Sequence, residues 1–147
     1  MGLFSSKKKD ISKGAAFNSS EGFAGILLAI IAADGVITNE EVIDFYSAVN
    51  KAKVLSNIGQ RDFKKMMDRL MKILKKQGVD ALLAQSVAGM TPDLSRGCYA
   101  YACEMVYSDS IADPSEIRLL NQVKTTMAIS DDWAAKCERV FQAKANI

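Results

Sequence analysis

Four acidic residues stand in two similarly spaced pairs, Asp34 with Glu41 and Asp109 with Glu116. In each pair the Asp precedes the Glu by seven residues, a spacing that allows a tight turn between two helices. Carboxylate oxygens without histidine or thiolate suit hard cations such as Ca²⁺ or Mg²⁺. The two turns therefore predict a divalent-cation site. The lesser candidate ligands are Glu40 and Asp113.

The same carboxylates also have a purely structural interpretation. Glu41 and Glu116 stand where a capping box places Glu, and Asp34 could accept a turn N–H as in an Asx-turn. Neither turn has the dense oxygen ligands of an EF-hand loop. Capping, however, does not require an Asp seven residues before each Glu in both halves. The residues alone leave both interpretations open.

The spacing of apolar residues predicts an all-α fold, a compact bundle of about seven helices. The expected ranges are 20–33, 39–51, 60–77, 79–88, 92–107, 114–128 and 131–145. The first helix is apolar on nearly every face, as a central helix surrounded by others must be. Cap residues mark several starts, among them Thr38, Asp113 and Ser130.

An internal repeat relates the two halves of the chain. A shift of 75 residues aligns Gly22 with Gly97 and places each acidic pair on the other. The same helix, turn and helix recur, so we expect two pseudo-symmetric helix-turn-helix halves around buried central helices. Gly25 aligns with Ala100, and these small residues would permit a close approach of helices.

Composition limits the class of protein. The 147 residues, 49% hydrophobic and 24% charged, suffice for one folded domain. Histidine is absent from the sequence, which removes the commonest general base and any Ser-His or Cys-His nucleophile. Cys98, Cys103 and Cys137 form no CxxC pair, so neither a zinc finger nor a disulfide framework is indicated. These features favour a non-enzymatic protein in a reducing compartment.

Residues 1–18 are expected to form a basic arm ahead of one helical domain at residues 19–147. The arm's lysines, with Leu3 and Phe4, would allow weak contact with the anionic inner face of a membrane. N-myristoylation at Gly2 and a solvated arm without a partner are the alternatives. Because the sequence has no spanning apolar stretch and no secretory signal, we expect a cytoplasmic protein.

Charge argues against nucleic-acid binding. Without residues 1–13, the chain holds 15 basic and 16 acidic side chains, whereas a general nucleic-acid binder is more basic. A basic row in the helix expected at 60–77 lacks interleaved aromatic residues, so it is interpreted as a solvated face.

The segments AADGVITNEEV and SDSIADPSEI resemble the turns of the TerB-like family, the tellurite-resistance domain also found beside J domains. The shared features are an apolar helix ending in Ala-Asp-Gly, an apolar residue soon after it, and a Glu seven residues after the Asp, repeated once. The resemblance covers residues 20 to 145 approximately. This sequence departs from the family pattern at Ser110, where the second turn usually has Gly. It also has Ser115 at the position where the first half has Glu40.

The resemblance implies a bundle of about seven helices with an acidic surface that binds divalent metal. By position, the implied ligands are Asp34, Glu41, Asp109 and Glu116. Family members are associated with stress responses, phage resistance and membrane-linked complexes that contain TerC-like metal transporters. The resemblance therefore implies a non-enzymatic, cation-binding adaptor whose partners are other proteins.

Two further functions stay open at this point. One is a metal-independent interaction scaffold, whose acidic turns only cap helices. The other is an enzyme in which the carboxylates position Mg²⁺ for phosphoryl transfer or hydrolysis.

Overall fold

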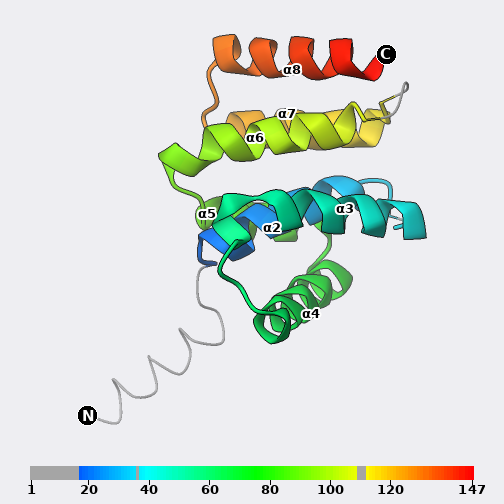
Figure 1. Ribbon diagram of the computed structural model, residues 1–147. Helices are drawn as coiled ribbons and strands as arrows, with labels where there is room; N and C mark the ends of the chain where they lie inside the picture. The colour runs from blue at the N-terminus through cyan, green and yellow to red at the C-terminus, as the bar shows by residue number, and fades with distance from the viewer. Residues whose placement is uncertain (1–16, 36, 109–111) are drawn as a thin grey trace.

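The computed structural model describes residues 17–35, 37–108 and 112–147. The helices are α2 (Ser19–Ile31), α3 (Asn39–Lys51), α4 (Gln60–Gln77), α5 (Val79–Ala88), α6 (Pro92–Val106), α7 (Pro114–Thr126) and α8 (Asp131–Ala145) (Figure 1). A 3₁₀ helix, η1, follows α3 at Lys53–Leu55. The described residues contain no β-strand, so the predicted all-α bundle of seven helices is confirmed.

Two of these helices end two residues earlier than the apolar spacing predicts. α7 stops because Ala128 has a positive φ of 54°, and the Ile129 N–H donates to the Lys124 carbonyl at 2.9 Å. This 6→1 hydrogen bond is that of a Schellman motif. α2 ends at Ile31, and Gly35, with φ 85°, closes the following turn. At both helix ends the turn geometry of the backbone outweighs the high helix propensity of the alanines, Ala32 and Ala33 after α2 and Ala128 after α7.

α2 is the central helix of the bundle. Every residue from Gly22 to Ile31 is buried, which confirms the expectation from its apolar surface. It packs against α3, α4, α5, α6, α7 and η1. The helix therefore connects the two halves of the chain through one core.

The most extensive helix contact is between α2 and α5, and small residues permit it. A Cβ added at Gly25 would overlap the Ser86 hydroxyl oxygen, and one at Gly22 would lie 2.7 Å from the Ser86 carbonyl oxygen. Ser86 is fully buried, and its hydroxyl donates to the Leu82 carbonyl at 2.7 Å, which satisfies it. Gly25 thus does allow a close approach of helices, but the partner is α5.

α6 is the second inner helix, and it packs against α2, α3, α7 and α8. The contacts between halves are reciprocal, since α3 lies against α6 and α7 lies against α2. Figure 1 shows the end of α2 and the start of α3 at the same end of the bundle as the end of α6 and the start of α7, on the right. The pseudo-twofold relation between the halves stays a prediction.

Candidate functional site

The first acidic turn joins α2 to α3. The Gly35 N–H donates to the Ala32 carbonyl at 2.9 Å, and Asp34 beside it is exposed. Glu41 and Thr38 form a capping box, in which each side chain accepts the other's backbone N–H at 3.1 Å. The cap occupies Oε1 of the Glu41 carboxylate. Because a carboxylate has two oxygens, capping and cation binding do not exclude each other at this residue.

The second acidic turn joins α6 to α7, and it lies partly outside the described residues. Asp109 and Ser110 fall in that part. Asp113 caps α7, since its Oδ1 accepts the Ser115 N–H at 2.7 Å. Glu116 lies half-buried in the first turn of the same helix.

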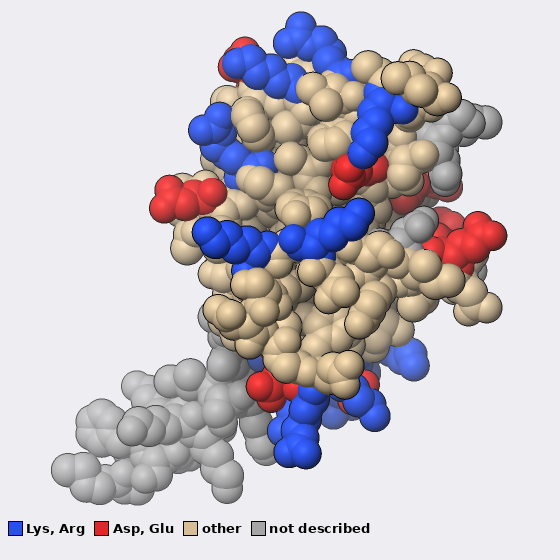
Figure 2. Space-filling model, in the orientation of Figure 1, with Lys and Arg blue, Asp and Glu red and all other residues tan. Residues whose placement is uncertain are grey.

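The fold brings the two turns to one end of the bundle. Figure 2 shows acidic side chains gathered at the right-hand edge, where Figure 1 places the start of α3 and the end of α6. Glu40, in the first turn of α3, is exposed there. Within the described residues, no group of three or more Asp, Glu or Cys side chains is arranged to hold a metal ion. Since Asp109 lies outside that part of the chain, the site with four carboxylates stays a prediction.

The three cysteine thiols offer little nucleophilic chemistry. All three are buried. Burial raises the pKa of the Cys98 and Cys103 thiols to about 12, and it also raises the pKa of Cys137. The thiols are therefore protonated near neutral pH, and the reactive thiolate form is scarce.

A buried tyrosine on α6 is an unexpected feature of the core. Tyr99 is fully buried, and its hydroxyl has no hydrogen-bond partner among the described residues. Burial, followed by the nearby Cys103 thiol, raises the pKa of this hydroxyl, so it stays protonated. A buried hydroxyl without a hydrogen-bond partner lowers the stability of the fold. No pattern in the sequence indicates this feature.

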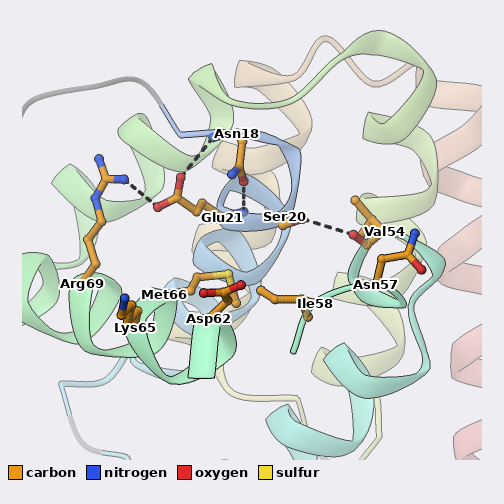
Figure 3. A pocket seen from close by; sticks show the side chains of 10 residues that line it. All are labelled: Asn18, Ser20, Glu21, Val54, Asn57, Ile58, Asp62, Lys65, Met66 and Arg69. Atoms are coloured by element: carbon orange, nitrogen blue, oxygen red, sulfur yellow. Dashed lines mark hydrogen bonds and ion pairs between the residues drawn. The ribbon is translucent and has the colours of Figure 1, made fainter. Parts of the chain in front are cut away.

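A second polar site, which the sequence did not predict, lies at the N-terminal end of α2 (Figure 3). A cavity of about 540 Å³ lies between the start of α2, the η1 segment and α4. Asn18 and Glu21 form a capping box at its edge, with N–H to oxygen distances of 2.9 and 3.2 Å. Arg69 of α4 donates to the second oxygen of Glu21 at 2.6 Å. The Asn-Ser-Ser-Glu sequence at 18–21 is the signal that would have located this cap.

Two further contacts fix the geometry of this cavity. The Ser20 hydroxyl donates to the Val54 carbonyl at 3.1 Å, which ties α2 to η1. The Arg69 guanidinium lies 4.8 Å from the ring centre of Phe17. Lys65 and Asp62 complete a rim of mixed charge, as Figure 3 shows. Such a rim suits a small polar molecule better than an apolar one.

Comparison with protein-family models, with curated proteins and with solved structures finds no match to this chain. The resemblance of the two acidic turns to the TerB-like family accordingly stays a resemblance. No helix in the described part of the chain combines the length and apolar character needed to cross a bilayer.

Proposed function

We propose that the chain is a non-enzymatic adaptor of a TerB-like tellurite or phage resistance system, and that its acidic turns bind Ca²⁺ or Mg²⁺. The proposal starts from the resemblance of the two turns to TerB-like segments. Its structural support is that both turns lie at one end of the bundle, after two helices, α2 and α6, that pack against each other (Figure 1). A cation shared by the turns would fix the relation between the two halves.

The ligands would come from both turns. Asp34 and Glu41 would supply the first turn's oxygens, and Asp109 and Glu116 those of the second. Ca²⁺ takes roughly six to eight oxygen ligands, so turn carbonyls or water would complete the set. The adaptor's partners would be other proteins, among them a membrane-linked complex with a TerC-like transporter. Cation binding would then control the surface presented to them.

A metal-independent interaction scaffold is the second candidate function, and the caps favour it. The Glu41 carboxylate accepts the Thr38 N–H at 3.1 Å, and the Asp113 carboxylate accepts the Ser115 N–H at 2.7 Å. These hydrogen bonds account for two of the six candidate ligands without any cation. In this function, partner binding would not depend on divalent ions.

A metal-assisted phosphoryl-transfer or hydrolytic enzyme has less support. The cavities beside α4 and between α3 and α4 are lined by residues other than the carboxylates of the acidic turns. Phosphodiester hydrolysis that requires Mg²⁺ and disappears in the Glu41→Gln variant would establish this function in place of the adaptor.

Titration of the full chain with CaCl₂ or MgCl₂, followed by amide NMR, tests the proposed cation site. We expect saturable shifts, at millimolar ion or below, at the amides of Asp34, Gly35, Glu41, Asp109 and Glu116. The double variant Asp34→Asn and Asp109→Asn should lose these shifts, because it removes one carboxylate from each turn while it preserves side-chain size.

A matched control separates cation binding from a change in net charge. Asp93 and Asp132 lie in the first turns of α6 and α8, away from the acidic turns (Figure 1). Their double change to Asn alters the net charge equally and should leave the shifts intact. If the wild type shows no shift at millimolar ion, the cation site is wrong. A TerC-like complex captured equally by wild type and the Asp34→Asn, Asp109→Asn variant would then establish the scaffold.

A further inference from the structure

The charges of the chain are strongly separated although its net charge is only +2. α4 holds seven basic and two acidic residues, a net of +5. Residues 1–16 hold four lysines and one Asp, a net of +3. The remaining residues hold eight basic and fourteen acidic side chains, a net of −6. A chain that is nearly neutral as a whole therefore has a basic part and an acidic part.

The basic residues of α4 form one face of that helix. At about 100° per residue, they fall within an arc of about 140° that lies roughly opposite the buried Met66 and Leu70. Six of them are exposed and have no ion pair within the described part of the chain. Asp68 also falls in this arc. The basic face consists of Arg61, Lys64, Lys65, Arg69, Lys72, Lys75 and Lys76.

The fold places this basic face at one extremity of the molecule. α4 makes its main contacts with α2 and α5 only, and Figure 1 shows it at the lower end of the bundle. Figure 2 shows Lys and Arg side chains gathered at that end. The described chain begins beside α4, because the Phe17 ring lies 4.8 Å from the Arg69 guanidinium.

We propose that the basic face of α4 binds the surface of a membrane that contains anionic phospholipids. Each basic residue close to such a surface adds a favourable attraction, which decays within a Debye length. A flat surface can contact the α4 end alone, while the acidic remainder of the molecule points away from it. The separation of charge would therefore orient the whole bundle with α4 against the lipid headgroups.

A membrane fits these observations better than a nucleic acid. A long polyanion would extend past α4 and meet the acidic remainder of the molecule. The basic face also lacks aromatic residues on which single-stranded bases could stack. The one aromatic residue of α4, Phe63, packs edge-on against Tyr46, with the ring centres 5.8 Å apart. The apolar side of α4 packs inward, so the contact is with headgroups and not by insertion of this helix into the acyl chains.

Vesicle co-sedimentation of the full chain tests the proposal. We expect binding to phosphatidylcholine vesicles that contain phosphatidylglycerol, no binding to phosphatidylcholine alone, and a loss of affinity as NaCl increases. The triple variant Lys65→Gln, Lys72→Gln, Lys76→Gln removes three exposed charges from the basic face. Its affinity should fall by roughly tenfold to a hundredfold. Thermal melting by circular dichroism checks that the variant is folded.

The matched control changes three exposed basic residues on α8, Lys136→Gln, Arg139→Gln and Lys144→Gln. It lowers the net charge equally and should change the affinity by less than about twofold, because α8 lies at the opposite extremity of the bundle (Figure 1). An equal loss of affinity in both triple variants would overturn the assignment to α4. Equal binding to neutral vesicles, or tighter binding to DNA than to anionic vesicles at the same salt, would overturn the membrane as partner.

The membrane contact does not depend on the proposed cation site. The acidic turns and the basic face lie on different elements, and the vesicle experiment is run with a chelator present. If the wild-type chain does not bind anionic vesicles but shows the cation-dependent NMR shifts, only the membrane proposal is contradicted. Vesicle binding without any cation shift would contradict only the proposed function.

Discussion

The two inner helices, α2 and α6, correspond in the 75-residue repeat but differ in their surroundings. α2 is buried along ten consecutive residues, whereas α6 has only six buried residues, all on one face. A Cβ at Gly22 would meet the Ser86 carbonyl oxygen at 2.7 Å, and one at its counterpart Gly97 would meet nothing within 4 Å. The repeat thus predicts the order and pairing of helices, but not the environment of each position.

The difference comes from the elements that come after each helix pair along the chain. After α3, the chain adds η1, α4 and α5, and all three pack against α2. After α7 it adds α8 alone, which packs against α6. The first half therefore has a complete shell and the second half an open side. Substitutions at corresponding positions should accordingly have different effects on stability.

The largest expected effect is at two glycines, one on each of these inner helices. Gly25→Ala should lower the free energy of unfolding by about 1 to 3 kcal/mol, since the added methyl overlaps Ser86 at the crossing with α5. Gly97→Ala should raise it by about 0.5 to 1 kcal/mol, because the position is open and alanine is the better helix former. Urea denaturation of both variants measures the contrast.

A second substitution verifies the cause of the Gly25 effect. Ser86→Ala removes the hydroxyl that the new methyl would overlap, so the double variant Gly25→Ala, Ser86→Ala should recover part of the lost stability. Equal destabilisation by Gly25→Ala and Gly97→Ala would show that the two helices are equally enclosed, contrary to the structure.

The next effect compares the capping boxes that start α2 and α3. Glu21→Ala should lower the free energy of unfolding by about 1 to 2 kcal/mol, because it removes both a helix cap and the carboxylate that pairs with Arg69. The Arg69 side chain is only 34% exposed. Glu41→Ala removes only a cap at the more exposed start of α3 and should cost about 0.5 to 1 kcal/mol. Thermal denaturation at low and high salt measures both, and the Glu21 effect should be the more salt-dependent.

The Glu41 variant also bears on the proposed function. If Glu41 only caps α3, the change to Ala should have the same effect on stability with and without millimolar CaCl₂. A larger loss of stability in the presence of CaCl₂ is the result that a cation ligand would give, because bound cation stabilises only the folded state.

The third effect concerns the hydroxyl of Tyr99 on α6, in the second half of the chain, whose shell of helices is open on one side. Tyr99→Phe removes a buried O–H that has no hydrogen-bond partner among the described residues. The free energy of unfolding should stay the same or rise by up to about 1 kcal/mol, since the ring and its packing remain. A loss of more than about 1 kcal/mol in urea denaturation, the value of one hydrogen bond, would indicate that the hydroxyl does have a partner, such as the Cys103 thiol.

Much of this fold could be predicted from the sequence, because its signals are local. The apolar surface of residues 20–33 indicates a buried central helix, and Thr38 with Glu41 marks the start of the next one. The contact of α2 with α5 could not be predicted, because it depends on which small residues meet across a long separation in the chain. The Glu21–Arg69 ion pair, 48 residues apart in sequence, is long-range in the same way.

The candidate site was less predictable than the fold. Sequence spacing identifies carboxylates that could share a cation, but the same spacing is explained by caps, and the structure does form the cap at Glu41. A local pattern therefore cannot separate the two functions. Which of the two functions applies depends on the distance between the Asp34 and Asp109 carboxylates. No pattern within one turn encodes that distance. The cation titration addresses that question directly.

The smallest expected effect is at the end of α7, where the second half uses Ala128 in a left-handed conformation. The positive-φ positions described in the first half, Gly35 and Gly78, are both glycines, which carry no such strain. Ala128→Gly should therefore raise the free energy of unfolding by about 0.5 kcal/mol, as relief of strain exceeds the added entropy of the unfolded chain. Ala143→Gly, the same change at an exposed helical position of α8, should instead lower it by about 1 kcal/mol. Effects of the same sign in urea denaturation would mean that the backbone at Ala128 is not strained.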